Sequence, residues 1–191
     1  MPNWCSNTIT LSHKDPAMID RAIKAFNEGT LFNEFVPCPA DLNITAGRLG
    51  DPDEQKALEA KEQANINKYG VANWYDWCVA NWGTKWDISP VNEAERIDEN
   101  TMTGFFDTAW GPAIQAYEAM EELGFTIDAM YHEPGMGFAG MYEDGYDEYL
   151  DLSGYDSEGL AEMLPERLDE AFCISEQAAQ WEEENQEAED E

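Results

Sequence analysis

The chain has 191 residues, of which 43% are hydrophobic and 12% aromatic, enough for one compact domain with its own core and an appendage. Its 10 Lys and Arg stand against 41 Asp and Glu, and the formal net charge of −31 repels nucleic-acid phosphates and anionic membrane surfaces. These totals argue against ordinary nucleic-acid binding and leave two interpretations: an acidic surface that competes for a basic partner, and one that only aids solubility.

The cysteines and the hydropathy pattern bear on where the protein works. Four cysteines are widely spaced without a C-x-x-C pair, no apolar run follows a basic N-terminal segment, and no stretch approaches about 18 apolar residues. We therefore expect no membrane span, a location in a cytosol, and reduced, mostly buried thiols at Cys5, Cys38, Cys78 and Cys173.

The first predicted elements are a strand and a helix. Residues 7–12 alternate apolar and polar side chains, which is typical of a half-buried strand. Asp15 then supplies an N-cap and Pro16 a first-turn proline for a helix over residues 16–28, which Gly29 ends.

Two further segments precede the tryptophan-rich stretch. Residues 31–42 contain Pro37 and Pro39, and these prolines favour an irregular segment that crosses the edge of the core. Residues 51–82 begin with Asp51 before a proline and predict two inserted helices.

The second half of the domain reads as strands around one helix. Residues 85–97 and 101–109 predict a hairpin joined by Asp-Glu-Asn, and a helix over 112–123 follows. Residues 125–133 alternate as a strand, and 137–152 predict a last hairpin that turns at Asp-Gly.

This order predicts an α+β fold, a ferredoxin-like split β-α-β antiparallel sheet with helices on one face and an extra hairpin. The domain is expected to cover residues 1–152, with a helical insertion at about 51–82, and an acidic extension covers 153–191. Order is expected to end near residue 180, beyond which the extension frays or is disordered. Before that point, docked helical turns are predicted from Leu160, Met163, Leu164, Leu168, Phe172 and Ile174.

The tryptophan segment raises the question of a core or a ligand platform. On a helix, Trp74, Cys78 and Trp82 recur at i, i+4 and i+8, and Trp77 lies beside them on one aromatic face. A base-stacking platform would need basic residues, and Lys85 is the only one in this segment. We therefore interpret the rings as core.

Known catalytic and metal motifs do not fit the sequence. His13 and His132 lack the spacing of a zinc site, and the segment 151–162 fails as a calcium loop because Asp156 stands where glycine is required. The glycines of 135–140 suit a turn rather than a phosphate loop. We predict no catalytic, metal-binding or cofactor-binding residues and no enzymatic activity.

Three stretches, MPNWCSNTITLS, VPCP and GVANWYDWCVANWGTKWD, together resemble the YubB-type ferredoxin-like domain family encoded by phages and plasmids, which includes Api-like phage proteins. The resemblance implies a ferredoxin-like fold and a mobile-element origin but no established catalytic residues, and it favours a packing role for Cys78. It covers most of residues 1–150 and rests on Trp4, Cys5, Asn7, Pro37, Pro39, Trp74, Tyr75, Trp77, Asn81, Trp82, Gly83, Thr84 and Trp86.

The acidic residues are concentrated near the C-terminus. Residues 141–191 contain 19 acidic residues and one basic residue, Arg167, and so carry −18 of the net charge of −31. Carboxylates on alternate residues of a strand recur at roughly 6 to 7 Å and can approximate phosphate spacing. We therefore predict an accessory protein of a phage or mobile element that binds and inhibits a host nucleic-acid-handling defence factor, such as a nuclease or restriction complex, by acidic mimicry of nucleic acid. The candidate partner-binding residues are Glu143, Asp144, Asp147, Glu148, Asp151, Glu158, Glu162, Glu166, Asp169 and Glu170.

Several alternatives stay open. The acidic residues can form a merely solvated surface, or they can join an assembly partner from the same mobile element. A small-molecule or nucleotide-binding module would use the aromatic helix and the 133–140 loop. An enzyme with an unfamiliar active site and a homo-oligomer are open as well.

Overall fold

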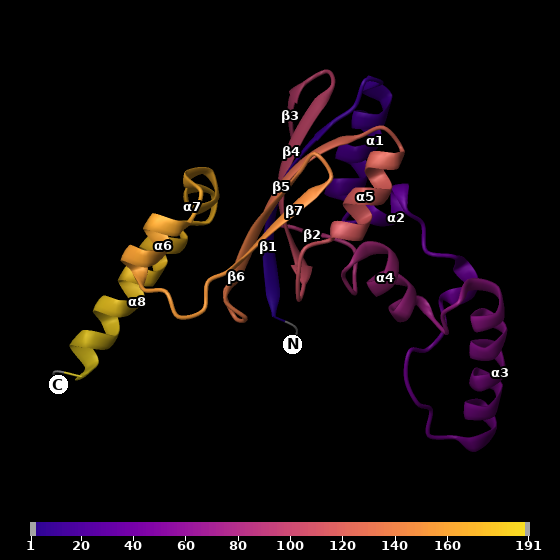
Figure 1. The fold of residues 1–191 in the computed structure, drawn as a ribbon. Coiled ribbons are helices and arrows are strands. Elements are labelled where there is room, and N and C mark those ends of the chain that lie inside the picture. The colour runs from indigo at the N-terminus through magenta and orange to yellow at the C-terminus, as the bar shows by residue number, and fades with distance from the viewer. Residues whose placement is uncertain (1–2, 190–191) are drawn as a thin grey trace.

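The structure, a computed structural model, describes residues 3–189, with side-chain surroundings described up to Asn185. It is a mixed α+β fold built on a seven-stranded antiparallel sheet (Figure 1). The strands are β1 (Trp4–Ser12), β2 (Ser89–Pro90), β3 (Glu95–Asp98), β4 (Thr101–Ala109), β5 (Thr126–Glu133), β6 (Phe138–Glu143) and β7 (Tyr146–Asp151).

Eight α-helices and one 3-10 helix, η1 (Ala40–Leu42), occur among the described residues. The predicted helices over 16–28 and 112–123 and the two within 51–82 are confirmed, with ends shifted by at most two residues. The α-helices are α1 (Pro16–Asn27), α2 (Leu31–Phe35), α3 (Pro52–Tyr69), α4 (Trp74–Trp82), α5 (Ile114–Glu122), α6 (Ser157–Met163), α7 (Glu166–Phe172) and α8 (Ile174–Glu189).

The sheet has the strand order β2-β4-β1-β5-β6-β7, and β3 also pairs with β4. The predicted strands at 7–12, 101–109 and 125–133 and the last hairpin are confirmed. The predicted hairpin of 85–97 with 101–109 is present, but 85–97 contains two short strands, β2 and β3, of which β2 lies at the end of the strand order. Pro90 has no N–H to donate, so β2 ends there, and β3 starts only at Glu95.

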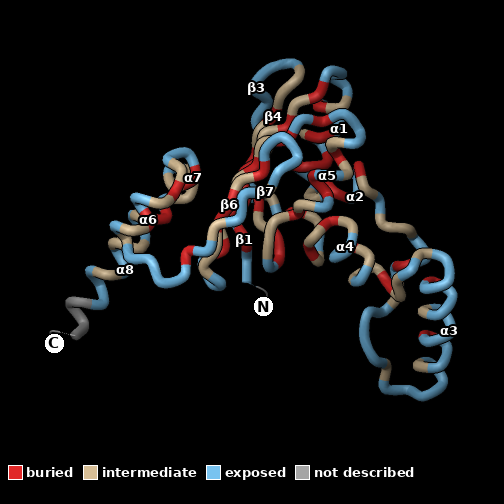
Figure 2. Tube along the Cα trace, in the orientation of Figure 1, coloured by how far each residue is buried: buried red, intermediate tan, exposed pale blue. Residues whose placement is uncertain are grey.

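The main core lies between one face of the sheet and α1, α2, α4 and α5 (Figure 2). Ile9 and Leu11 of β1 point into it beside Phe106 of β4, and all three side chains are fully buried. Gly104 of β4 permits this packing, because a Cβ atom there would lie 2.4 Å from the Phe26 ring of α1. The alternating apolar residues of β1 therefore lie on the face of the sheet that is buried in the main core.

Helices also cover part of the opposite face, so the prediction of helices on one face was wrong. Met130 of β5 and Met141 of β6 point away from the main core and pack with Leu164 and Leu168 of the C-terminal helices. These apolar side chains on the second face would otherwise face water, and α6, α7 and α8 bury them. The predicted docking of the extension through its apolar residues is confirmed.

Helix α2 forms the first part of the segment 31–42, for which an irregular crossing was predicted, and the stretch with Pro37 and Pro39 is irregular as expected. The first amide groups of α2 lack a local cap, but the Asp87 carboxylate accepts hydrogen bonds from the N–H of Phe32 at 2.9 Å and of Asn33 at 2.8 Å. A residue more than fifty positions away in the chain therefore stabilises the start of this helix, and no pattern within 31–42 could indicate it.

The C-terminal helix extends beyond the expected end of order near residue 180. Helix α8 runs to Glu189, and Asp190 and Glu191 lie outside the described residues. Glu182 of α8 accepts hydrogen bonds from the backbone N–H of Ser157 at 2.8 Å and from its hydroxyl at 2.7 Å, which ties this helix to α6. This tertiary contact stabilises α8 just beyond residue 180, where the sequence has no apolar periodicity.

The insertion forms an arm at the side of the domain. Helix α3 is exposed along most of its length, and only Leu58 and Asn65 are buried (Figure 2). The Asn65 side-chain amide donates to the carbonyl oxygens of Ala72 at 2.9 Å and Asp41 at 3.3 Å. These bonds fix the base of the arm next to α4.

Candidate functional site

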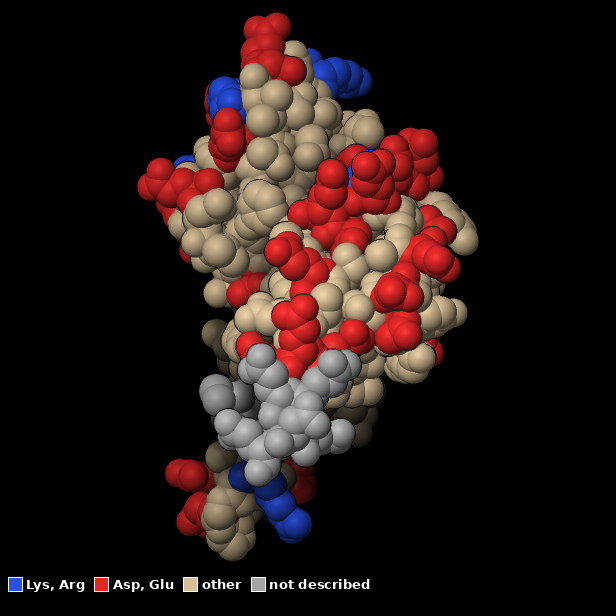
Figure 3. Space-filling view, turned by 90° about the vertical axis from the view of Figure 1, so that its left-hand side faces the viewer, with Lys and Arg blue, Asp and Glu red and all other residues tan. Residues whose placement is uncertain are grey.

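Two regions of the surface are candidates for function. The first is the acidic surface, defined by the ten carboxylates predicted as partner-binding residues. Figure 3 shows that Asp and Glu side chains gather on the face formed by the C-terminal helices. Its members are Glu143, Asp144, Asp147, Glu148, Asp151, Glu158, Glu162, Glu166, Asp169 and Glu170.

The acidic residues of the last hairpin do not share one face of the sheet. Asp147 pairs with Tyr142, whose side chain is buried in the main core, whereas Glu148 pairs with Met141 on the side of the C-terminal helices. Asp147 and Asp151 lie on the same face but are separated by Tyr149 at the intervening same-face position. The spacing of roughly 6 to 7 Å expected for carboxylates on alternate residues therefore does not occur on β7.

Several of these carboxylates already have partners within the chain. Asp147 accepts a hydrogen bond from the Tyr131 hydroxyl at 2.7 Å, and burial raises the pKa of its carboxyl while this bond opposes the shift. Asp151 accepts from the Ser153 N–H at 2.9 Å, which lowers its pKa. Asp169 accepts from the backbone and the hydroxyl of Ser175 at the start of α8. These three residues help to build the fold.

The exposed carboxylates of α6 and α7 make fewer hydrogen bonds and ion pairs within the chain. Glu158 and Glu162 are four residues apart on α6, and Glu166 and Glu170 are four apart on α7. All four side chains are exposed, and side chains at this spacing lie about 5–6 Å apart at their Cβ atoms. The closest regular carboxylate spacing is thus found on the helices rather than on β7.

The single basic residue of this region is neutralised. Arg167 of α7 donates to both carboxylate oxygens of Asp128 at 3.1 and 2.9 Å and approaches Glu143 at 3.3 Å. Glu143 is therefore partly compensated, whereas the outward carboxylates of α6 have no basic partner within 4.0 Å among the described residues.

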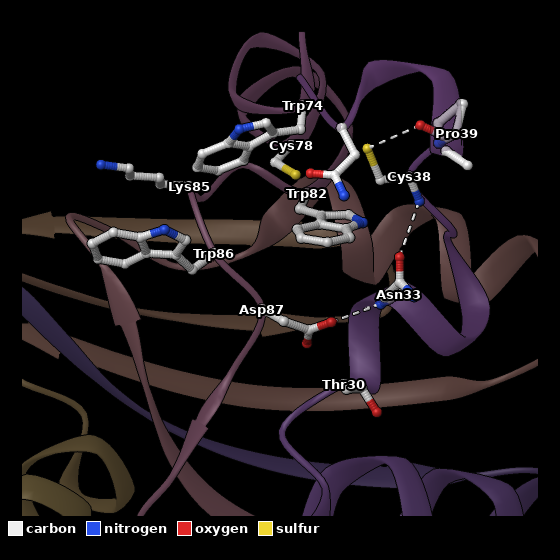
Figure 4. Close-up of a pocket in the computed structure, with 12 residues that line it drawn as sticks. Thr30, Asn33, Cys38, Pro39, Trp74, Cys78, Trp82, Lys85, Trp86 and Asp87 are labelled. Atoms are coloured by element: carbon white, nitrogen blue, oxygen red, sulfur yellow. Dashed lines mark hydrogen bonds between the residues drawn. The ribbon is translucent and has the colours of Figure 1, made fainter. Parts of the chain in front are cut away.

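The second candidate region is the aromatic cavity, a hollow of about 400 Å³ (Figure 4). It lies between α2, the loop around η1, α4 and the segment after α4. Its walls combine indole rings, two thiols and several amides. The lining residues are Thr30, Asn33, Cys38, Pro39, Ala40, Asn43, Trp74, Cys78, Trp82, Lys85, Trp86 and Asp87.

Local capping positions the aromatic helix α4. The Asn73 side chain accepts from the N–H of Tyr75 at 2.9 Å and of Asp76 at 3.3 Å, so the helix starts at Trp74. Gly83 ends it with φ of 84°, a conformation that favours glycine. Trp82 fixes the far end, because its indole Nε1 donates to the Val36 carbonyl at 2.9 Å.

Burial divides the tryptophans into two groups. Trp82 is 5% exposed in the core, and Trp74 and Trp77 pack partly buried against that core. Trp86 is 39% exposed and lies 6.1 Å from the ring of Trp4, which is 44% exposed. The interpretation as core is confirmed for Trp82 and Cys78, and Trp86 belongs to the surface instead.

Burial affects the acid and thiol groups that line the aromatic cavity, and it raises the pKa of each of them. Burial raises the pKa of Asp87, although its carboxylate accepts backbone hydrogen bonds from Phe32, Asn33 and Ile88. Burial is the main cause that raises the pKa of the Cys78 thiol to about 12, and the neighbouring Cys38 is the second. Burial also raises the pKa of Cys38. Neither thiol is activated as a nucleophile.

Lys85 is enclosed by aromatic rings at the rim of the aromatic cavity. Its Nζ lies 4.3 Å from the ring centroid of Trp86 and 5.6 Å from those of Tyr75 and Trp110. A second hollow of about 500 Å³, the Trp110 cavity, adjoins it. Sequence reasoning missed Tyr75 and Trp110 as partners of Lys85, because Tyr75 lies on α4 and Trp110 follows β4, and only the tertiary structure brings both beside Lys85. The Trp110 cavity is lined by Ala46, Gly47, Asn73, Trp74, Tyr75, Lys85 and Trp110.

The loop at 133–140 has a structural role. The buried Glu133 carboxylate accepts hydrogen bonds from the N–H of Gly135, at 3.1 Å, and from that of Met136. The two cavities that Trp74 lines take their other walls from residues 30–47, Lys85 to Asp87, and Trp110 rather than from this loop.

The described part of the chain has neither a cluster of metal ligands nor a helix suited to span a membrane. Within residues 3–189, His, Cys, Asp and Glu side chains form no group of three or more that could hold a metal ion. Over the same residues, no helix combines the length and apolar character that a membrane crossing requires.

Comparison with known proteins gives little further information. No family model matches the chain, and no curated protein matches its sequence. A solved structure of the protein api92 from Yersinia pseudotuberculosis, described with the family model DUF1281, is similar at a TM-score of 0.42 and 12% identity. The similarity covers 81% of this chain and 100% of that one.

Proposed function

We propose that the protein binds the basic surface of a host nucleic-acid-handling defence factor, such as a nuclease or restriction complex, and inhibits it by occupying its nucleic-acid site. The observation that carries this proposal is the two pairs of exposed carboxylates on the docked helices, Glu158 and Glu162 on α6 and Glu166 and Glu170 on α7. A basic groove built for phosphates attracts such a surface by the same charges.

The location of the charge supports this proposal over a uniformly solvated surface. The last quarter of the chain carries −18 of the net charge of −31, and its one Arg is paired with Asp128 and Glu143. The helices that carry the carboxylates are fixed to the sheet by Leu160, Leu164 and Leu168. Fixed carboxylates lose less conformational entropy on binding than those of a flexible tail.

We also propose a ferredoxin-like fold and membership of the YubB-type family. The element order β1-α1-β3-β4-α5-β5 and the strand order β3-β4-β1-β5 support the fold, since this is the pattern of a split β-α-β sheet. The family motifs at the N-terminus and around α4 support the membership. With it come the proposals of a phage or mobile-element origin and of action in the cytosol of the host.

The test is affinity capture from a lysate of the host bacterium on the full-length tagged protein, followed by elution with salt and then with duplex DNA. The decisive variant carries Glu158→Gln, Glu162→Gln, Glu166→Gln and Glu170→Gln. Its matched control carries the same charge change on exposed residues elsewhere, Glu93→Gln, Glu95→Gln, Glu99→Gln and Glu122→Gln.

We expect duplex DNA to release a nucleic-acid-binding protein from the wild type and the control variant, and the decisive variant to capture none. Equal loss in both variants would mean that only net charge matters. Capture of no basic protein by the wild type would refute the proposal.

A further inference from the structure

The aromatic cavity and the Trp110 cavity are neighbours that share two wall residues, Trp74 and Lys85. Their volumes, about 400 and 500 Å³, fall within the range of about 300–1,000 Å³ found for small-ligand sites. In Figure 4 the rings of Trp74 and Trp86 border the same opening, and Lys85 lies at its rim. The walls are therefore flat rings with one cation between them.

Aromatic rings at this site remain accessible to a ligand. Trp86 is 39% and Trp110 is 43% exposed, whereas Trp82 at the bottom of the aromatic cavity is 5% exposed. Partly exposed indole rings that border a cavity can stack on a planar heteroaromatic ring, since every nucleobase has a π-face, and at Trp86 such a ring would displace the Lys85 ammonium that now lies 4.3 Å from the ring centroid. The amides of Asn33 and Asn43 in the same wall can form hydrogen bonds to the edge of such a ring.

The charge around Lys85 selects an anionic ligand. Among the described residues, no carboxylate oxygen lies within 4.0 Å of its ammonium group, although the chain has 41 acidic residues. Asp87 is the only acidic residue lining either cavity, and both of its oxygens accept backbone N–H groups. The remaining surface repels further negative charge, which favours a small ligand with one anionic group over a nucleic-acid strand.

Hydrogen bonds within the chain hold the backbone at Trp110 in an uncommon conformation. Trp110 has φ of 72°, a conformation that is uncommon for residues other than glycine. Its N–H donates to the Asn3 carbonyl at 2.9 Å, and the Thr108 hydroxyl donates to the Gly111 carbonyl at 2.7 Å. The backbone from which the Trp110 ring projects is therefore set by contacts within the chain.

We propose that these two cavities form one binding site for a planar heteroaromatic compound with a single anionic group, as in a nucleoside monophosphate. The heteroaromatic ring stacks on Trp86, and the anionic group pairs with Lys85. This site is separate from the exposed carboxylates of α6 and α7, so either proposal can fail without the other.

The experiment titrates the full-length protein with AMP and with adenosine by isothermal calorimetry, and repeats the AMP titration with CMP, GMP and UMP. Trp86→Ala removes the stacking ring, and Lys85→Met removes the charge but keeps a long apolar side chain. The matched controls are Trp181→Ala on α8 and Lys56→Met on α3, both at exposed positions. Trp110→Gly, which keeps the backbone conformation at a positive φ, is an independent ring variant.

We expect saturable binding of at least one nucleoside monophosphate, and a loss of affinity of about five-fold or more in Trp86→Ala and Trp110→Gly. Lys85→Met should weaken the binding of AMP but not that of adenosine, so that the ratio of the two affinities falls towards one. Both controls should bind as the wild type does.

Three results would overturn the proposal. The first is no saturable binding of any of these compounds up to about 5 mM. The second is wild-type affinity in Trp86→Ala, which would place the binding elsewhere. The third is tighter binding of tetramethylammonium than of AMP, which would mean that the rings form a cation cage in which Lys85 is the resident occupant.

Discussion

Arg167 of α7 donates two hydrogen bonds to the Asp128 carboxylate of β5, and its neighbour Leu168 is fully buried between the same two elements. The C-terminal helices are thus attached to the sheet by an ion pair at the surface and by apolar packing beneath it. The two contacts differ greatly in the free energy that they contribute, because the ion pair is about two-fifths exposed whereas Leu168 is excluded from water.

The first prediction compares these contacts. Leu168→Ala should lower the free energy of unfolding by about 2–5 kcal/mol, since it leaves a cavity in the second core. Arg167→Gln should lower it by no more than about 1 kcal/mol, because water screens the pair that it removes. Urea denaturation followed by circular dichroism measures both values. A larger effect of Arg167→Gln than of Leu168→Ala would mean that the ion pair holds the helices.

The second prediction concerns the close approach of β5, β6 and β7 at Gly140. A Cβ atom there would lie 2.2 Å from the Tyr131 hydroxyl and 2.5 Å from the Glu148 carbonyl oxygen. Gly140→Ala should therefore cost about 1–3 kcal/mol, because the Glu148 backbone cannot move without breaking the β6–β7 ladder. Gly50→Ala, at a position with no atom within 4 Å, is the control and should leave the melting temperature unchanged or raised.

The third prediction is a pH dependence that arises from His132. The centroid of this imidazole lies 6.0 Å from that of the Phe172 ring at the end of α7, and burial lowers the pKa of His132. The folded state therefore disfavours the protonated form, and its contribution to stability is lost as the pH falls below the unfolded value of about 6.5 towards the folded one.

Chemical denaturation at pH 7.5 and 5.5 tests this effect as a difference between wild type and His132→Gln, which cancels the contribution of the carboxylates. Relative to the variant, the wild type should be less stable at pH 5.5 than at pH 7.5. Parallel pH curves for the two proteins would show that His132 does not titrate differently on folding.

The fourth prediction concerns the cap that Asp87 forms on α2. Asp87→Ala should destabilise the fold by about 1–3 kcal/mol, because the N–H groups of Phe32 and Asn33 lose their acceptor and Phe32 is a buried residue. Asp53→Ala, at an exposed position in α3, removes a carboxylate without this role and should have a much smaller effect. Equal melting temperatures of the two variants would argue that the cap contributes nothing.

The fifth prediction ranks the thiols. Burial raises the pKa of Cys5 and of Cys78 to about 12, whereas Cys173 is exposed at the end of α7. Because the thiolate is the reactive form, iodoacetamide at pH 8 should modify Cys173 first and leave Cys5 and Cys78 unmodified until the protein unfolds. Mass spectrometry of tryptic peptides over time would reveal the opposite order if either buried thiol were activated.

The sequence by itself determined the elements whose signals are local. Asp15 and Pro16 begin α1 through a cap and a fixed φ, and the Asp144-Gly145 pair forms the β6–β7 turn with φ of 52° and 74°. The alternation of β1 indicated its buried face, and the helical spacing of Trp82 and Cys78 indicated their burial. In each case the residues that interact are neighbours along the chain, so their pattern is visible in the sequence.

Only the tertiary structure decided the features that depend on distant residues. Asp87 caps α2 although it lies more than fifty residues away in the chain. The Tyr131 hydroxyl donates a hydrogen bond to Asp147, one of the residues of the predicted acidic surface. Trp110, just after β4, lies beside the Lys85 ammonium group. The net charge indicated an acidic surface, but strand register and helix docking set which carboxylates point outward, because neighbouring residues on a strand project to opposite faces.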